Sequence, residues 1–166
     1  MPERLTHFPP VARADAKFLI LGTFPGEKSL AVGQYYADSR NQFWRIMDAV
    51  LGISETDYDA RLNALQNNHI ALWDVLKHCT RESSADKKIK NEEPADFQTF
   101  FDAHPQIEKI LFNGKKDACE YYDKLVRPHL SARHQNLMRE TLQSSSSVNT
   151  TLRLEEKTRL WREALG

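Results

Sequence analysis

The chain has 166 residues, 40% hydrophobic and 28% charged, which is enough length and apolar content for one ordinary domain with a packed core. Its 23 basic and 23 acidic residues give a net charge of zero, which excludes a polybasic nucleic-acid-binding chain. Two cysteines, Cys79 and Cys119, are too few for a disulfide-stapled secreted scaffold. Residues 1–10 lack the apolar run of a signal peptide, and no apolar stretch is long enough to span a bilayer. We therefore expect a soluble, cytoplasmic protein with no membrane partner.

The first predicted element is a buried strand at residues 17–22 (KFLILG), because its apolar residues are consecutive rather than alternating. Turn-forming residues 22–26 (GTFPG) follow it as a loop. Helical spacing of apolar residues begins after Asn41, and Ser39 with Gln42 three positions later is the pattern of a capping box.

The middle of the chain continues the alternation of helix and strand. A helix is predicted at 57–68 and a second strand at 70–76 (IALWDVL). Residues 81–94 are polar and charged, which indicates a surface loop with at most a short helix. Residues 96–104 fit a helix that Pro105 stops.

The last third of the chain repeats the pattern. A third strand is predicted at 107–112 and a weaker fourth at 137–142, with a helix at 116–126 between them. Residues 143–151 (QSSSSVNTT) form a polar loop, and residues 152–165 a terminal helix. No repeat or domain break interrupts the chain, so we expect one α/β domain over residues 1–166.

Strands separated by helices are joined by crossover connections, which predicts a largely parallel sheet with helices on both faces. In such sheets ligands bind outside the carboxyl ends of the strands. The loops expected to matter are residues 23–41, 74–81, 113–116 and 143–149.

Several kinds of site lack their sequence patterns. The six histidines show no metal-ligand spacing with each other or with the cysteines, so no metal is expected. No phosphate-binding glycine loop is present, and no G-x-S-x-G elbow surrounds Ser146 to make it a nucleophile. No cofactor is expected.

The sharpest feature lies between the first strand and the first long helix. Residues 33–44 (GQYYADSRNQFW) hold two adjacent tyrosines, an arginine and an asparagine. In one interpretation Tyr35 and Tyr36 cover the sheet edge and Asn41 helps to cap the helix. In the other, an aromatic face stacks on a planar ligand while amide groups bind its polar edge.

The segments LGTFPG (21–26) and YYADSRNQFW (35–44) resemble motif 1 of the uracil-DNA glycosylase superfamily. The hypoxanthine-DNA glycosylase branch and the mismatch-specific uracil-DNA glycosylases are the most similar groups. Further segments continue the resemblance in order from residue 8 to residue 161: LWDVL (72–76), ADF (95–97), FNGK (112–115) and LQSSSSVN (142–149).

This resemblance implies a three-layer α/β domain with a central four-stranded parallel sheet flanked by helices. It also implies a monofunctional DNA glycosylase that removes deaminated bases, hypoxanthine or uracil, from DNA without metal or cofactor. The neutral charge makes a monomer the expectation. Two alternatives stay open: a non-catalytic relative that binds nucleic acid or a nucleobase, because Asp38, Ser39, Gln143 and Ser147 depart from the family motifs, and an α/β enzyme acting on a small nucleotide.

The resemblance also implies roles for single residues. Asn41 falls on the asparagine that positions the attacking water, and Tyr36 on the aromatic residue that stacks on the flipped base. Phe24 lies in the base-binding loop, where the mismatch-specific branch has its catalytic asparagine. Asn113 falls where a side chain reads the base edge, and Val148 near the residue that wedges into the duplex.

Phosphate contacts on a neutral protein require local cations. Arg40, Lys115 and Lys116 are the candidates, the last two beside a predicted helix N-terminus, and the loop serines Ser144 and Ser146 add hydroxyl groups. The run 87–90 (KKIK) either touches DNA or is a solvated charge run. Asp74, at the end of a predicted strand, is either a carboxylate on the pocket floor or a cap.

Overall fold

The computed structural model describes residues 4–53, 57–81 and 89–166. Its centre is a parallel sheet in the order β3-β2-β6-β7. The strands are β2 (Phe18–Gly22), β3 (Ile70–Asp74), β6 (Lys109–Asn113) and β7 (Met138–Leu142). The predicted fold class, a four-stranded parallel sheet flanked by helices, is confirmed.

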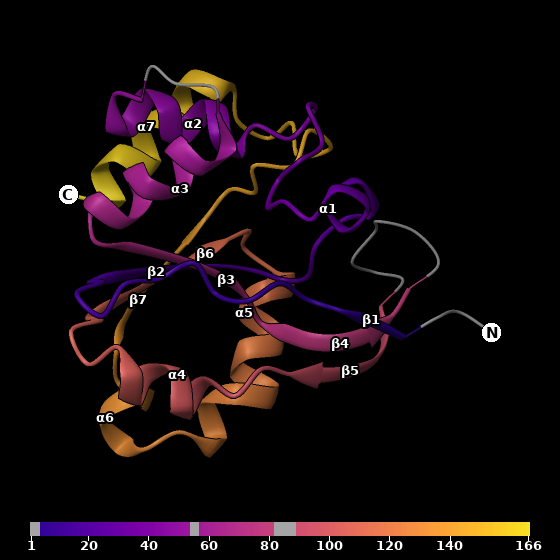
Figure 1. The fold of residues 1–166 in the computed structure, drawn as a ribbon, viewed down its shortest axis with the longest axis vertical. Coiled ribbons are helices and arrows are strands. Elements are labelled where there is room, and N and C mark those ends of the chain that lie inside the picture. Colours follow the sequence, from indigo (N-terminus) through magenta and orange to yellow (C-terminus); the bar gives the residue numbers. More distant parts are fainter. Residues whose placement is uncertain (1–3, 54–56, 82–88) are drawn as a thin grey trace.

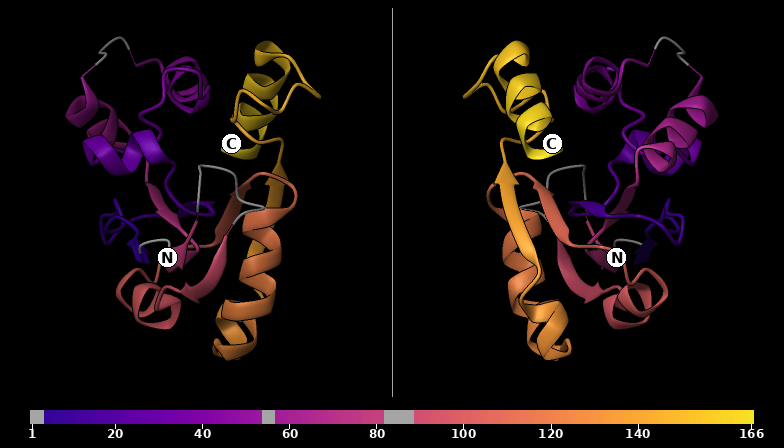
Figure 2. Two further views of the ribbon diagram at one scale, coloured as in Figure 1. Left: turned by 90° about the vertical axis from the view of Figure 1, so that its right-hand side faces the viewer. Right: turned by 90° about the vertical axis from the view of Figure 1, so that its left-hand side faces the viewer.

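Helices cover both faces of this sheet and make three layers (Figures 1 and 2). On one face lie α2 (Phe43–Leu51), α3 (Tyr58–Asn67) and α7 (Leu154–Ala164). On the other lie α4 (Phe97–Ala103), α5 (Asp117–Tyr121) and α6 (Ala132–Gln135), with α5 continuing as a π-helical segment, Tyr122–Val126. A short helix, α1 (Glu27–Val32), follows the loop after β2.

The alternation of side chains along β2 divides the core in two. Ile20 packs in a cluster with Phe43 and Trp161, on the side of α2 and α7. Leu19 and Leu21 pack in the other cluster, which contains Phe97 and other aromatic residues of α4 and its neighbours. Because each face of the sheet is covered, β2 and β3 are nearly continuous apolar runs. Both strands could therefore be predicted from the sequence.

A second, antiparallel sheet extends from one side of the parallel sheet (Figure 1). It consists of β1 (Arg4–Thr6), β4 (Leu76–Thr80) and β5 (Lys90–Pro94) in the order β1-β4-β5. The strand predicted over 70–76 is confirmed over Ile70–Asp74, but residues 76–80 form a second strand that was not predicted, and the loop predicted over 81–94 was wrong at residues 90–94. Residues 76–80 (LKHCT) and 90–94 (KNEEP) are half-exposed and polar, so their backbone pairing leaves no apolar pattern in the sequence. Residues 87 and 88 of the KKIK run lie outside the described residues.

The ends of the helices show which capping signals were sound. Asp57 accepts a hydrogen bond from the Ala60 N–H and Asp96 from the Thr99 N–H, so α3 and α4 begin where the sequence predicted. The predicted capping box at α2 was wrong: Gln42 is the N-cap residue and caps no N–H with its side chain. Asn41 caps the start of α2 instead, because its Oδ1 accepts a hydrogen bond from the Phe43 N–H at 2.9 Å.

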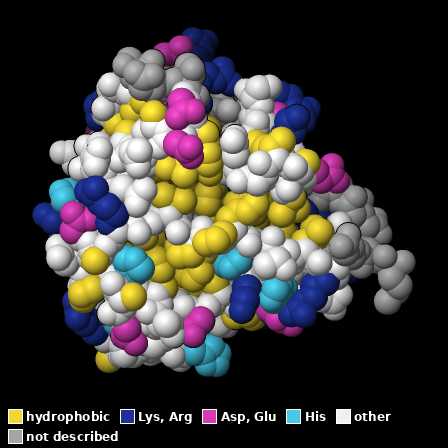
Figure 3. Space-filling model, viewed as in Figure 1, with side chains coloured by type: hydrophobic (Ala, Val, Ile, Leu, Met, Phe, Trp, Pro, Cys, Tyr) yellow, Lys and Arg dark blue, Asp and Glu magenta, His cyan; other side chains and the backbone are white. Residues whose placement is uncertain are grey.

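Charged groups are mixed on the face shown in Figure 3, where basic and acidic side chains surround a central apolar area. Within the described ranges, no helix combines the length and the apolar character needed to cross a membrane.

Candidate active site

A cavity of about 830 Å³ opens at the carboxyl edge of the parallel sheet. Its walls come from the loop after β2, the segment with Tyr35 and Tyr36, the end residues Asp74 of β3 and Asn113 of β6, and residues 144–151 after β7. All four loops predicted from topology thus supply wall residues, although 74–81 and 113–116 supply one each, Asp74 and Asn113. The cavity lies within the size range of small-molecule and cofactor sites.

Ser145 is the centre of the hydrogen-bond network in this cavity. Its Oγ donates to Asn41 Oδ1 at 2.8 Å and accepts from Asn113 Nδ2 at 2.9 Å. Its backbone N–H donates to Asn113 Oδ1 at 2.9 Å, and its carbonyl accepts the Gln42 N–H at 2.8 Å. The side chain is 1% exposed. The sequence analysis missed Ser145 and selected its two neighbours.

Asn41 lines the cavity with its amide in a defined orientation. The carbonyl oxygen accepts from both the Phe43 N–H and the Ser145 hydroxyl, so its two lone pairs are in use. Among the described residues, none accepts a hydrogen bond from its Nδ2. The group that Asn41 offers to a ligand is therefore a donor, and the role implied by the resemblance, positioning of the attacking water, would use this NH2 group.

Tyr36 is backed by Phe43, whose ring lies nearly parallel to it with centroids 4.1 Å apart. Its backbone is left-handed, with φ of 53°, a conformation that a tyrosine rarely adopts. Its hydroxyl accepts from Asn113 Nδ2 at 3.0 Å. The half-buried ring thus has one supported face and lines the cavity, as a stacking platform requires.

Both N–H groups of the Asn113 side chain are engaged within the protein. Its Nδ2 donates to Tyr36 and to Ser145, and its Oδ1 accepts the Ser145 N–H. In this arrangement the side chain orients Tyr36 and Ser145, and the expected contact with a base edge could use the second lone pair of Oδ1 without opening any of these bonds.

The floor of the cavity holds a buried carboxylate. Asp74 is 4% exposed and lines the cavity where β3 ends. A Cβ on Gly22 would stand 2.6 Å from Asp74 Oδ1 and 2.9 Å from the Tyr36 hydroxyl oxygen, so both groups approach the end of β2 closely. This approach is possible only because residue 22 has no side chain.

Phe24 belongs partly to the core. It is 7% exposed, packs in the α4 cluster and lines the cavity. The Arg81 guanidinium lies 5.3 Å from the centre of its ring and donates a hydrogen bond to the Pro25 carbonyl. Arg81 therefore holds the loop after β2 against the second sheet.

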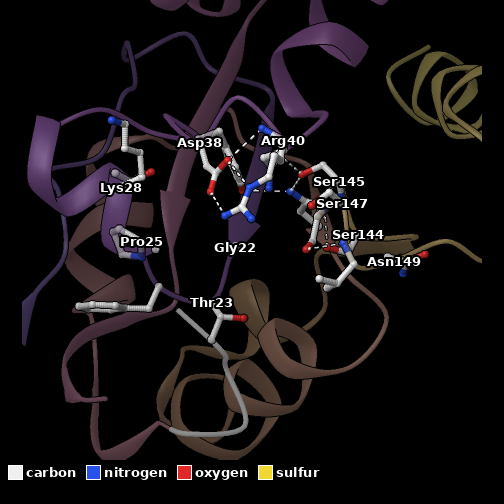
Figure 4. A pocket seen from close by; sticks show the side chains of 18 of the residues that line it. Gly22, Thr23, Pro25, Lys28, Asp38, Arg40, Ser144, Ser145, Ser147 and Asn149 are labelled. Carbon is white, nitrogen blue, oxygen red and sulfur yellow. Dashed lines mark hydrogen bonds and ion pairs between the residues drawn. The ribbon is translucent and has the colours of Figure 1, made fainter. Parts of the chain in front are cut away.

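The predicted phosphate-binding cations are in different places. Arg40 lines the cavity, but it donates to Asp38 through its backbone N–H, Nε and Nη2 at 2.9, 3.1 and 2.8 Å (Figure 4). These bonds lower the pKa of the exposed Asp38 carboxyl to about 2. Lys115 and Lys116 are exposed and do not line the cavity; Lys115 borders a smaller hollow. Lys28, which the sequence analysis did not select, stands on the cavity wall (Figure 4).

The loop after β7 is internally bonded. Ser144 Oγ accepts the Ser146 N–H at 3.1 Å, and Ser146 Oγ accepts the Val148 N–H at 3.4 Å. Val148 stands out from this turn with 87% of its surface exposed. Ser144, Ser146 and Val148 all line the cavity, as residues that meet DNA beside it must.

A buried lysine fastens this loop to the helical layer. Lys157 of α7 is 1% exposed, and its Nζ donates to Gln42 Oε1 and to the Asn149 carbonyl, each at 2.9 Å. Burial lowers its pKa from the ordinary value. The sequence carried a signal for it, because Lys157 lies on the same helical face as Leu154 and Trp161 at spacings of three and four.

A cavity with an aromatic platform and oriented amide groups at the edge of an α/β sheet is the arrangement of proteins that hold an extruded nucleobase. Residues 9–163 match the family model of the uracil DNA glycosylase superfamily. A hypoxanthine DNA glycosylase of Methanosarcina barkeri is 41% identical over 122 residues, which are 72% of this chain and 76% of that protein.

A hypoxanthine DNA glycosylase of Methanosarcina acetivorans is 38% identical over 122 residues, with the same shares covered. The solution NMR structure of a candidate uracil DNA glycosylase, also from M. acetivorans, superimposes with a TM-score of 0.82 at 32% identity, over 98% of this chain and 97% of that one. The chain belongs to the uracil DNA glycosylase superfamily and is a DNA glycosylase, a hydrolase of N-glycosyl bonds.

Proposed function

We propose that this enzyme removes hypoxanthine from DNA and that Asn41 is its catalytic residue. The observation that carries the proposal is that Asn41 and Tyr36 line one cavity and are joined through Ser145 and Asn113. Relatives at 41% and 38% identity that are named hypoxanthine DNA glycosylases support the choice of base.

Cleavage of the N-glycosyl bond leaves positive charge on the sugar and negative charge on the base. Hypoxanthine spreads that negative charge over its ring system, so a strong acid is not required. Asn41 cannot act as a base, and its carbonyl is engaged, so it contributes its N–H groups. These hold the attacking water through one of its lone pairs and leave another free to attack the sugar carbon, while the N-glycosyl bond breaks and the departing base anion takes up the proton that the water loses. Positioning of this kind can supply several kcal/mol of barrier reduction.

The base reaches the cavity by leaving the duplex, at a cost of a few kcal/mol. Stacking on an aromatic side chain returns about 1–3 kcal/mol per base, and Tyr36, supported by Phe43, is the platform for it. Val148 at the rim is the apolar residue that would fill the space left in the duplex.

Asp74 is the group we assign to base selection. Hypoxanthine carries a ring N–H beside a carbonyl, whereas adenine, from which it forms by deamination, has a lone pair at that nitrogen. A carboxylate on the cavity floor accepts the first and repels the second. A site that offers an unmatched polar group rejects the wrong ligand strongly.

The test uses end-labelled duplexes that carry one hypoxanthine, one uracil or one adenine at the same position. After incubation, alkali reveals abasic sites by strand cleavage. We expect cleavage at hypoxanthine and none at adenine, and Asn41→Ala should lower the single-turnover rate about 100-fold or more while DNA binding persists. The matched control is Asn136→Ala, which removes an exposed amide whose one side-chain bond within the described ranges is to the Ala132 carbonyl. Cleavage at uracil alone would refute the choice of base, and binding without cleavage would refute catalysis.

A further inference from the structure

We propose that Ser145 is a positioning residue that fixes the Asn41 amide with its NH2 group facing the cavity. The proposal rests on the proposed catalytic role of Asn41 and adds how that side chain is held. The Ser145 hydroxyl itself contacts no reacting atom, so Ser145 acts through Asn41.

The direction of the hydrogen bonds follows from two backbone groups that can only donate. The Ser145 N–H bonds to Asn113 Oδ1, so the other end of that amide, Nδ2, must be the donor to Ser145 Oγ. The serine hydroxyl then has its single hydrogen free to donate to Asn41 Oδ1. The Phe43 N–H meets the same oxygen and reinforces the orientation. A reversed Asn41 amide would place its NH2 against the Phe43 N–H and would leave the Ser145 hydroxyl hydrogen without this acceptor.

The neighbouring serines cannot do this work. The Ser144 and Ser146 hydroxyls accept backbone N–H groups of their own turn, and Ser147 is exposed. Figure 4 shows Ser145 with Ser144 and Ser147 in the loop after β7, and its hydroxyl bonds across to Asn41 in the segment 33–44. One member of a run of four identical residues is thus buried at the junction between that segment and the loop after β7.

The substitution Ser145→Ala isolates the hydroxyl. The backbone bonds from Ser145 to Asn113 and Gln42 do not need the side chain and should keep the loop in place. Without the hydroxyl, Asn41 Oδ1 accepts only from the Phe43 N–H among the two groups that now donate to it, and the side chain can leave its productive rotamer. We expect a fall of about tenfold in the single-turnover rate with little change in affinity for hypoxanthine-containing DNA. Ser131→Ala, which removes a hydroxyl bonded to His134 in the opposite helical layer, is the matched control and should have no effect.

A double-mutant cycle separates positioning from general loosening of the loop. If Ser145 acts through Asn41, Ser145→Ala should have no further effect on the residual rate of Asn41→Ala. A tenfold loss that persists in the Asn41→Ala background would overturn the proposal.

A second measurement needs no substrate. The variant Asn41→Asp places a carboxyl at the same position, and NMR titration gives its pKa. Adding Ser145→Ala should raise that pKa, because a donor to the ionised form is lost, whereas adding Ser131→Ala should not. An unchanged pKa would overturn the positioning role whatever the enzyme excises. A raised pKa in a protein that excises no base would leave that role standing and refute the proposed function.

Discussion

Gly22→Ala tests whether the close packing at the end of β2 matters for catalysis. The new Cβ would lie 2.6 Å from Asp74 Oδ1 and 2.9 Å from the Tyr36 hydroxyl oxygen. Carbon and oxygen atoms in close non-bonded contact rest about 3.3 Å or more apart. The carboxylate must therefore move by about 0.7 Å and the hydroxyl by about 0.4 Å, on the same C···O contact scale.

A displacement of about 1 Å in an active site can cost about 100-fold in rate, so we expect Gly22→Ala to lose about 10- to 100-fold in turnover. The assay is single-turnover excision from a hypoxanthine duplex, beside thermal unfolding of the same samples. The control is Gly52→Ala at the end of α2, where φ is +67° and nothing lies within 4 Å of the added Cβ. A side chain in that left-handed conformation costs about 1–2 kcal/mol of stability, with no effect on the site. The reasoning fails if Gly22→Ala retains full turnover, or loses only what its unfolded fraction explains.

Tyr36→Ala should weaken capture of the base by about 1–3 kcal/mol in single-turnover titrations, whereas Tyr36→Phe should stay within a few-fold of the parent; equal losses would contradict stacking. Val148→Gly should reduce excision more on a well-paired duplex than on a mismatch or a single strand, and an equal loss in all three would show that it does not act through the duplex. Burial, with a smaller effect from His78, lowers the pKa of His7 to about 4. In the unfolded chain His7 is protonated below its ordinary pKa near 6.5, whereas in the folded chain it stays neutral down to about pH 4. The free energy of unfolding should therefore fall as the pH is lowered from 6.5 to 4, by up to about 3 kcal/mol. His7→Gln should remove that part of the pH dependence, and an unchanged slope between pH 7 and pH 4.5 in chemical denaturation would contradict it.

The central sheet could be predicted from the sequence because each of its strands is covered on both faces or ends in a recognisable turn. FLILG at β2 and IALWD at β3 are nearly continuous apolar runs, which a buried parallel strand requires. β4 and β5 were missed for the opposite reason. They pair through their backbones while side chains such as Lys77 and Glu93 point to solvent, so their sequences look like a loop.

At the site, the resemblance to the family motifs was sufficient to find Asn41, Tyr36 and Asn113, which line one cavity. Their roles in the reaction stay predictions. Ser145 could not be found, because four consecutive serines give no pattern and only the path of the backbone after β7 decides which one is buried. Sequence reasoning therefore selected Ser144 and Ser146, whose hydroxyls support the turn.

The cations predicted to bind phosphate are the site residues that the fold does not bring together as unpaired charges at the cavity. Lys115 and Lys116 lie outside the cavity, and Arg40 is neutralised by Asp38 through three hydrogen bonds. A phosphate that recruits Arg40 must first replace a carboxylate, which returns less free energy than binding an unpaired cation. We therefore infer that, apart from those of Lys28, phosphate contacts at the cavity contribute little net attraction, and that the salt dependence of binding is shallow. The affinity for a damaged site then has to come mainly from contacts with the extruded base. It therefore depends on Tyr36 and on the groups that orient Tyr36.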